Sequence, residues 1–133
     1  MSDKKHKAVL LVDDDSTDNY LNKKTIESNN FAEKIYLSTN ALSAVELLQN
    51  FEEYNTEMLP DVIFLDLDMP FIDGFEFLDR FEEFKPETIE KCKVVILTSS
   101  INPADAERSE IYSFVRKYLR KPLTEENLNT LSF

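Results

Sequence analysis

Five short apolar clusters recur along the chain, and each is separated from the next by a stretch long enough to hold a helix. The clusters span residues 8–12, 34–37, 61–65, 93–97 and 117–119. The first, third and fourth are continuous apolar runs, which is typical of parallel strands covered by helices on both faces. The second and fifth are predicted to be edge strands. The clusters therefore predict a strand–helix unit that is repeated along the whole chain.

Cap residues predict where the intervening helices begin. The caps are Asn40, Asn102 and Thr124. Apolar residues at helical spacing follow Asn40, and a proline at the first helical position follows Asn102. A further apolar stripe at helical spacing follows Asp73 and Gly74. A first helix is predicted at about 17–28, with Asp15 or Ser16 as its cap, and a short last helix at 125–133. Residues 51–60 are interpreted as a helix end and a loop.

A helix–strand alternation of this regularity implies right-handed crossovers between parallel strands. We therefore predict an α/β fold, a flavodoxin-like doubly wound five-stranded parallel sheet in the order 2-1-3-4-5 with helices on both faces. A chain of 133 residues is long enough for one core of ordinary size, so we expect one domain over residues 1–133.

Composition disfavours several classes of function. The net charge of −11 would repel nucleic acid, and the first apolar run is too short for a signal peptide or a membrane span. Because Cys92 is the one cysteine, no intrachain disulfide can form, and a cytoplasmic location is expected. Gly74 is the one glycine, which excludes a Gly-rich phosphate loop. His6, the one histidine, is expected in a mobile amino-terminal segment, and therefore neither as a catalytic base nor as a phosphocarrier.

Polar side chains follow the strands at their carboxyl ends, where open parallel sheets bind ligands. They are Asp13, Asp14 and Asp15 after the first strand, Asp66 and Asp68 after the third, Thr98, Ser99 and Ser100 after the fourth, and Lys121 after the fifth. In the predicted strand order, Asp13, Asp14 and Asp66 face one another, and carboxylates about 4 Å apart repel by about 4 kcal/mol per pair at an effective dielectric near 20. A protonated carboxyl could offset this repulsion, but an oxygen-only cluster beside solvent is better matched to a hard cation. Mg²⁺ is the expected cofactor, with Mn²⁺ as an alternative.

Asp66 is the predicted nucleophile, because it directly follows the buried run at 62–65 and should be held rigidly at the centre of the sheet. A carboxylate in such a site can attack phosphorus and form an aspartyl phosphate. Lys121 would supply a fixed positive charge, and Thr98 a hydroxyl donor, for the transferring group.

Several short motifs stand in this order along the chain. Val-Asp-Asp ends the first strand at 12–14, and Asp66 opens the run Asp-Leu-Asp-Met-Pro-Phe-Ile-Asp-Gly. Thr98 follows the fourth strand, while Lys121 precedes a proline and has Tyr118 three residues before it. Over essentially its whole length, the sequence resembles the receiver domains of two-component response regulators, the CheY-like family, of the single-domain type.

The resemblance implies that Asp66 accepts a phosphoryl group from a sensor histidine kinase or a histidine phosphotransfer protein. It also implies a metal site in which Asp14 and Asp66 bind through their carboxylates, Asp13 through water and Asp68 through its backbone carbonyl. The chain would catalyse only its own phosphorylation and dephosphorylation. It is expected to be a monomer or a phosphorylation-dependent dimer, with no nucleic-acid or membrane partner.

The resemblance further implies how a signal would leave the site. Thr98 and Lys121 would contact the phosphoryl group, and Tyr118 would swing inward and remodel a face that binds a downstream target protein. The peptide bond between Lys121 and its following proline is a candidate for the cis form. Asp68 and Ser100 occupy positions that tune hydrolysis in receivers. The last helix is short for the family, so part of the output face is expected to be reduced.

Two other interpretations are weighed against this one. A haloacid-dehalogenase-type phosphatase has a similar nucleophile motif. That motif requires Thr or Val four residues after the nucleophile, where this chain has Pro70. Such a phosphatase also needs a downstream acid and a cap domain. A pseudo-receiver would be a protein-binding module that is not phosphorylated, and the retention of every site residue disfavours it.

Overall fold

A computed structural model describes residues 6–67, 73–99, 102–131 and 133. Its centre is a five-stranded sheet in the order β2-β1-β3-β4-β5, and every neighbouring pair of strands is parallel. The strands are β1 (His6–Val12), β2 (Ala32–Ser38), β3 (Val62–Leu65), β4 (Lys93–Thr98) and β5 (Val115–Arg120). The predicted fold class, strand order and edge strands are confirmed.

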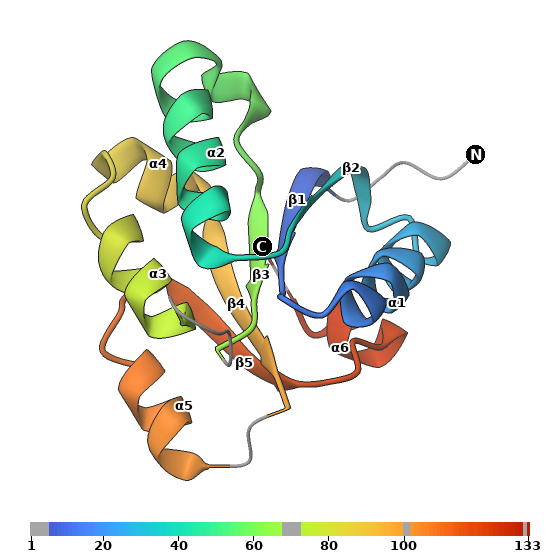
Figure 1. Cartoon of the computed structure of the whole chain (residues 1–133). Coiled ribbons are helices and arrows are strands. Elements are labelled where there is room, and N and C mark those ends of the chain that lie inside the picture. The colour runs from blue at the N-terminus through green and yellow to red at the C-terminus, as the bar shows by residue number, and fades with distance from the viewer. Residues whose placement is uncertain (1–5, 68–72, 100–101, 132) are drawn as a thin grey trace.

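Helices cover both faces of the sheet (Figure 1). α1 and α6 lie on one side, and α2, α3 and α4 lie on the other, with α5 beside α3. The bounds are α1 (Ser16–Ser28), α2 (Ala41–Tyr54), α3 (Gly74–Phe81), α4 (Pro86–Lys91), α5 (Pro103–Ser109), α6 (Glu125–Asn129) and the 3-10 turn η1 (Thr56–Met58). Of the helices in the described residues, none is long and apolar enough to cross a membrane.

The central strands contribute side chains to two hydrophobic cores, one on each face of the sheet. In β3, Ile63 and Leu65 belong to the core beneath α2 and α3, whereas Val62 and Phe64 belong to the core beneath α1 and α6. Because successive side chains of a strand point to opposite faces, a strand between two cores must be apolar at every position. This double burial explains the continuous apolar runs in the sequence.

The predicted cap residues open the helices in the structure. Asp15, rather than Ser16, caps α1, and its carboxylate accepts hydrogen bonds from the backbone N–H groups of Thr17 and Asp18. The other side-chain caps are Asn40 for α2, Asp73 for α3, Asn102 for α5 and Thr124 for α6. Each cap satisfies N–H groups that have no partner inside the helix.

The amino-terminal boundary of the sheet differs from the sequence-based prediction. His6 is the first residue of β1 and not part of a mobile segment; it pairs with Ala32, and its backbone N–H donates to the carbonyl of Phe31. The His6 ring also packs on the Phe31 ring, with centroids 4.7 Å apart. Pairing with β2 therefore extends β1 two residues beyond the apolar run, a tertiary effect that the composition of residues 6 and 7 does not reveal.

Two helical segments also differ from prediction. The last helix ends at Asn129 and does not extend through 125–133. The helix α4 was not expected, because a six-residue helix that begins with proline is too short to show an apolar stripe.

Candidate functional site

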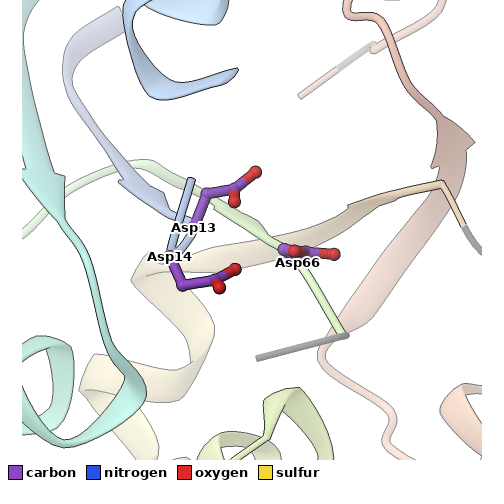
Figure 2. Close-up of side chains that lie close together, drawn as sticks. All are labelled: Asp13, Asp14 and Asp66. Carbon is purple, nitrogen blue, oxygen red and sulfur yellow. The ribbon is translucent and has the colours of Figure 1, made fainter. Parts of the chain in front are cut away.

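Three carboxylates meet at the carboxyl ends of β1 and β3. Val12 pairs with Leu65, so the residues that follow these two strands emerge side by side. Figure 2 shows Asp13, Asp14 and Asp66 extending into the same space. One oxygen of each carboxylate lies within 4.8 Å of the others. Asp13 and Asp66 are buried while Asp14 is exposed, so the group is open to solvent on one side.

Backbone hydrogen bonds hold Asp13 and Asp66 in place. The N–H of Asp66 donates to the carbonyl of Val12 at 2.9 Å, and the N–H of Asp13 donates to the carbonyl of Ser38 at 3.0 Å. The side-chain amide of Asn19, which is buried in α1, donates to the carbonyl of Asp13 at 3.0 Å. The N–H of Asp15 donates to the Asp13 carboxylate at 2.9 Å. The site is therefore anchored by β1, β2, β3 and α1 together.

Gly74, the chain's one glycine, supports Asp66 from the start of α3. A Cβ atom at this position would lie 2.7 Å from both the Asp66 carbonyl oxygen and the Leu67 Cα, which is closer than packed atoms tolerate. The N–H of Gly74 donates to the Leu67 carbonyl at 3.0 Å. Only a residue without a side chain lets α3 approach the backbone of Asp66 this closely.

Lys121 brings a positive charge to the carboxylates from the end of β5. Its Nζ lies 2.6 Å from an oxygen of Asp13, 2.7 Å from one of Asp18 and 3.5 Å from one of Asp66. Its backbone N–H donates to the carbonyl of Thr98 at 2.9 Å, which ties the end of β5 to the end of β4. The peptide bond from Lys121 to Pro122 is cis, as expected.

Burial and neighbouring charges shift the pKa values of two groups in the site. Burial raises the pKa of Asp13, and its hydrogen bond to Lys121 offsets this effect only in part. Burial alone would lower the pKa of Lys121, but hydrogen bonds to Asp13 and Asp18 outweigh it and raise that pKa. Lys121 is therefore a permanent cation, and the carboxylates around it compete for its charge.

The donor set fits a hard divalent cation. Asp13, Asp14 and Asp66 offer only oxygen ligands, close together and beside solvent, and Mg²⁺ or Mn²⁺ prefers such ligands together with water. A cation there would also reduce the mutual repulsion of the three carboxylates. Asp14 and Asp66 would hold the metal through their carboxylate oxygens, and Asp13 would act through water.

Two of the other predicted residues, Thr98 and Tyr118, lie on β4 and β5. Thr98 is fully buried at the end of β4, and Tyr118 is half-buried on β5 beside the core beneath α2 and α3. Asp68 and Ser100 lie outside the described residues.

Sequence reasoning missed Asp18 and Asn19, both in the first two turns of α1. Asn19, Asn22 and Ile26 are the buried residues of this helix, and their three- and four-residue spacing marks its inward face. The helix α1 directly follows the aspartate pair, and it has two polar residues on its inward face. This pattern could have revealed that α1 contributes to the site. A search for apolar stripes alone overlooks it.

Comparisons with known proteins agree with this arrangement. The sequence model described as "Response regulator receiver domain" matches residues 9–132. The crystal structure of a two-component response regulator from Cytophaga hutchinsonii is 34% identical, has a TM-score of 0.87, and is matched over 96% of this chain and 94% of that chain.

Response regulator Rcp1 of Synechocystis is 32% identical over 107 residues, which is 79% of this chain and 71% of Rcp1. The crystal structure of its Mn²⁺-bound form has a TM-score of 0.74, with 30% identity over 93% of this chain and 87% of that chain. A protein-glutamate methylesterase/protein-glutamine glutaminase of Burkholderia thailandensis is 36% identical over 99 residues. The match covers 74% of this chain and 24% of that longer protein, so the activity in its name is not carried over. None of these similarities favours a haloacid-dehalogenase-type phosphatase.

Proposed function

The chain belongs to the response regulator receiver family of two-component signalling, and from that premise we propose that it takes a phosphoryl group onto Asp66 in a Mg²⁺-dependent reaction. The convergence of Asp13, Asp14 and Asp66 within 4.8 Å, next to Lys121, is the observation that carries the proposal. It joins a nucleophile, a set of metal ligands and a fixed cation in one place.

Asp66 is suited to the role of nucleophile. Its backbone is fixed to β1 and packed against Gly74, so its carboxylate has a defined direction, and Lys121 lies 3.5 Å from one of its oxygens. A carboxylate oxygen of Asp66 would attack the phosphorus of a phosphohistidine, and the phosphorus–nitrogen bond would break. The imidazole nitrogen keeps the electron pair of that bond and takes up a proton. Lys121 and Thr98 would then face the new negative charge.

We propose Mg²⁺ as the physiological metal and Mn²⁺ as a substitute. The proposal rests on the all-oxygen donor set of Asp13, Asp14 and Asp66 and on the Mn²⁺-bound form of the relative Rcp1. By the family resemblance, Asp68 would add its backbone carbonyl as a further donor. A bound cation would supply positive charge to the oxygens of the transferring group.

The phosphoryl donor in this proposal is a sensor histidine kinase or a histidine phosphotransfer protein, and the output is a contact with a downstream protein. A phosphoryl group adds a charge of about −1.5 to −2. Lys121 and Thr98 would respond to it, and Tyr118 on β5 would then move inward, which biases an existing equilibrium between two conformations. The chain would work in the cytoplasm, as a monomer or a phosphorylation-dependent dimer, and would catalyse only its own phosphorylation and dephosphorylation.

The test is phosphorylation by acetyl phosphate, followed by intact-protein mass spectrometry. The wild-type chain should gain one phosphoryl group with Mg²⁺ and lose this gain with EDTA, and Asp66→Asn should gain none. Asp61→Asn is the matched control, because it makes the same substitution at the opposite end of β3. If the wild type gains no label, the chain is a pseudo-receiver; equal labelling of Asp66→Asn would assign the phosphoryl group to another residue.

A further inference from the structure

Asp18 contacts Lys121 as closely as the residues of the proposed site do. It lies in the first turn of α1, and its carboxylate is 2.7 Å from the Lys121 Nζ, against 2.6 Å for Asp13 and 3.5 Å for Asp66. These residues are 103 positions apart in the sequence, so the fold itself creates the contact. Neither the strand-end pattern nor the family motifs singled out Asp18.

Asp18 differs from the other partners of Lys121 in its surroundings. Within the described part of the chain, the metal-binding group comprises Asp13, Asp14 and Asp66, and Asp18 is not part of it. The side chain of Asp18 is 35% exposed, compared with 5% for Asp13. A cation bound to the three carboxylates would weaken the hold of Asp13 and Asp66 on Lys121 but leave the hold of Asp18 in place.

The ammonium group of Lys121 has three N–H donors. Asp13 and Asp18 take two of them at hydrogen-bond distance, and the contact with Asp66 is longer. A phosphoryl group on Asp66 presents three strong acceptor oxygens, and they must draw donors of Lys121 away from its present partners. Asp18 can give up its hydrogen bond from Lys121 at low cost, because solvent already reaches its carboxylate.

We propose that Asp18 is a positioning residue that holds Lys121 while Asp66 is unmodified and competes with the phosphoryl oxygens for it afterwards. This proposal rests on the proposed function of Asp66. Asp18 would thereby set how strongly the site favours its phosphorylated conformation, without touching the metal or the reacting atoms.

The experiment measures the affinity of the whole chain for beryllium fluoride, a phosphoryl mimic, in the presence of Mg²⁺ by calorimetry. Asp18→Asn should bind it roughly three- to tenfold more tightly than the wild type, because Lys121 is released from a charged partner. Asp15→Asn is the matched control: it removes one negative charge three residues away, does not touch Lys121, and asparagine still caps the helix. Its affinity should change less than about twofold.

A double-mutant cycle separates competition for Lys121 from a general effect of charge. In a Lys121→Ala background, Asp18→Asn should change the affinity no more than Asp15→Asn does. Asp18→Glu, which keeps the charge, should stay close to the wild type. Equal effects of Asp18→Asn and Asp15→Asn in the wild-type background would overturn this inference alone, whereas a wild type that does not bind beryllium fluoride would overturn the proposed function and this inference with it.

Discussion

Aspartates at opposite ends of the parallel strands lie in opposite electrostatic surroundings. These ends form the amino-terminal and the carboxyl-terminal edge of the sheet, as distinct from its edge strands β2 and β5. At the amino-terminal edge, Asp61 accepts a hydrogen bond from the Lys91 Nζ at 2.8 Å and from the Lys7 backbone N–H at 2.9 Å, and the His6 ring lies 3.9 Å away. At the carboxyl-terminal edge, Asp13 and its neighbours share the ammonium of Lys121. One edge gives several donors to one carboxylate, and the other gives one lysine to several carboxylates.

The pKa shifts of the two edges have opposite signs. Burial raises the pKa of Asp61, but its hydrogen bonds to Lys91 and Lys7 outweigh burial, so the net shift is downward. Burial also raises the pKa of Asp13, and there the shared Lys121 does not outweigh it. Ionised Asp61 therefore stabilises the fold, whereas ionised Asp13 is held at a cost that an added cation can offset.

The largest expected effect is stabilisation by metal. Mg²⁺ at about one hundred times its dissociation constant should raise the free energy of unfolding by about 2.7 kcal/mol. The chain has no tryptophan, so urea unfolding is best followed by circular dichroism. Asp61→Asn should keep this gain and Asp14→Asn should lose most of it. An equal gain in both variants would place the metal elsewhere.

Neutralising one acid of the carboxyl-terminal edge should stabilise the metal-free chain. Asp66→Asn removes the repulsion of Asp66 with Asp13 and Asp14, while Lys121 keeps its two closer partners. We expect a gain of about 1–2 kcal/mol in EDTA, less than the full repulsion because solvent and Lys121 already reduce it. Urea unfolding in EDTA measures this gain. A loss of stability would show that Lys121 already offsets the negative charge of Asp66.

The same substitution at the amino-terminal edge should have the opposite sign. Asp61→Asn removes the charge that pairs with Lys91 but keeps an acceptor for the Lys7 N–H, so we expect a loss of about 1 kcal/mol. The measurement is urea unfolding of both variants under one set of conditions. A gain like that of Asp66→Asn would remove the contrast between the edges.

The smallest effect is the pH dependence of that loss. Because the pKa of Asp61 is lower in the folded chain, its contribution is complete above its ordinary value of about 3.9 and is lost as the pH falls through the folded-state pKa. The stability difference between wild type and Asp61→Asn should thus shrink below about pH 4. Unfolding titrations at several pH values test this, and a difference that persists in acid would assign the loss to packing instead of charge.

The sequence predicts the sheet well because strands between two cores must be apolar at every position, as Val62 to Leu65 are. Strand order then brings Asp13, Asp14 and Asp66 together. The prediction that His6 lies outside the sheet was wrong, because pairing with β2, and not local composition, decides where β1 begins.

Two long-range side-chain pairs could not be predicted. The contact of Asp18 with Lys121 depends on how α1 is rotated about its axis, and the asparagines on its inward face hide that rotation from a search for apolar stripes. Similarly, Asp61 was assigned only to a strand cluster, since its partner Lys91 lies 30 residues away on α4.

The most direct test of the proposed site is to identify the aspartate that carries the phosphoryl group. Treatment with acetyl phosphate and Mg²⁺, reduction of the aspartyl phosphate by borohydride and peptide sequencing by mass spectrometry would locate it. We expect modification at Asp66 alone, and none when EDTA replaces Mg²⁺. Modification at Asp13, Asp14 or Asp18, or at Asp66 to the same extent in EDTA, would contradict it.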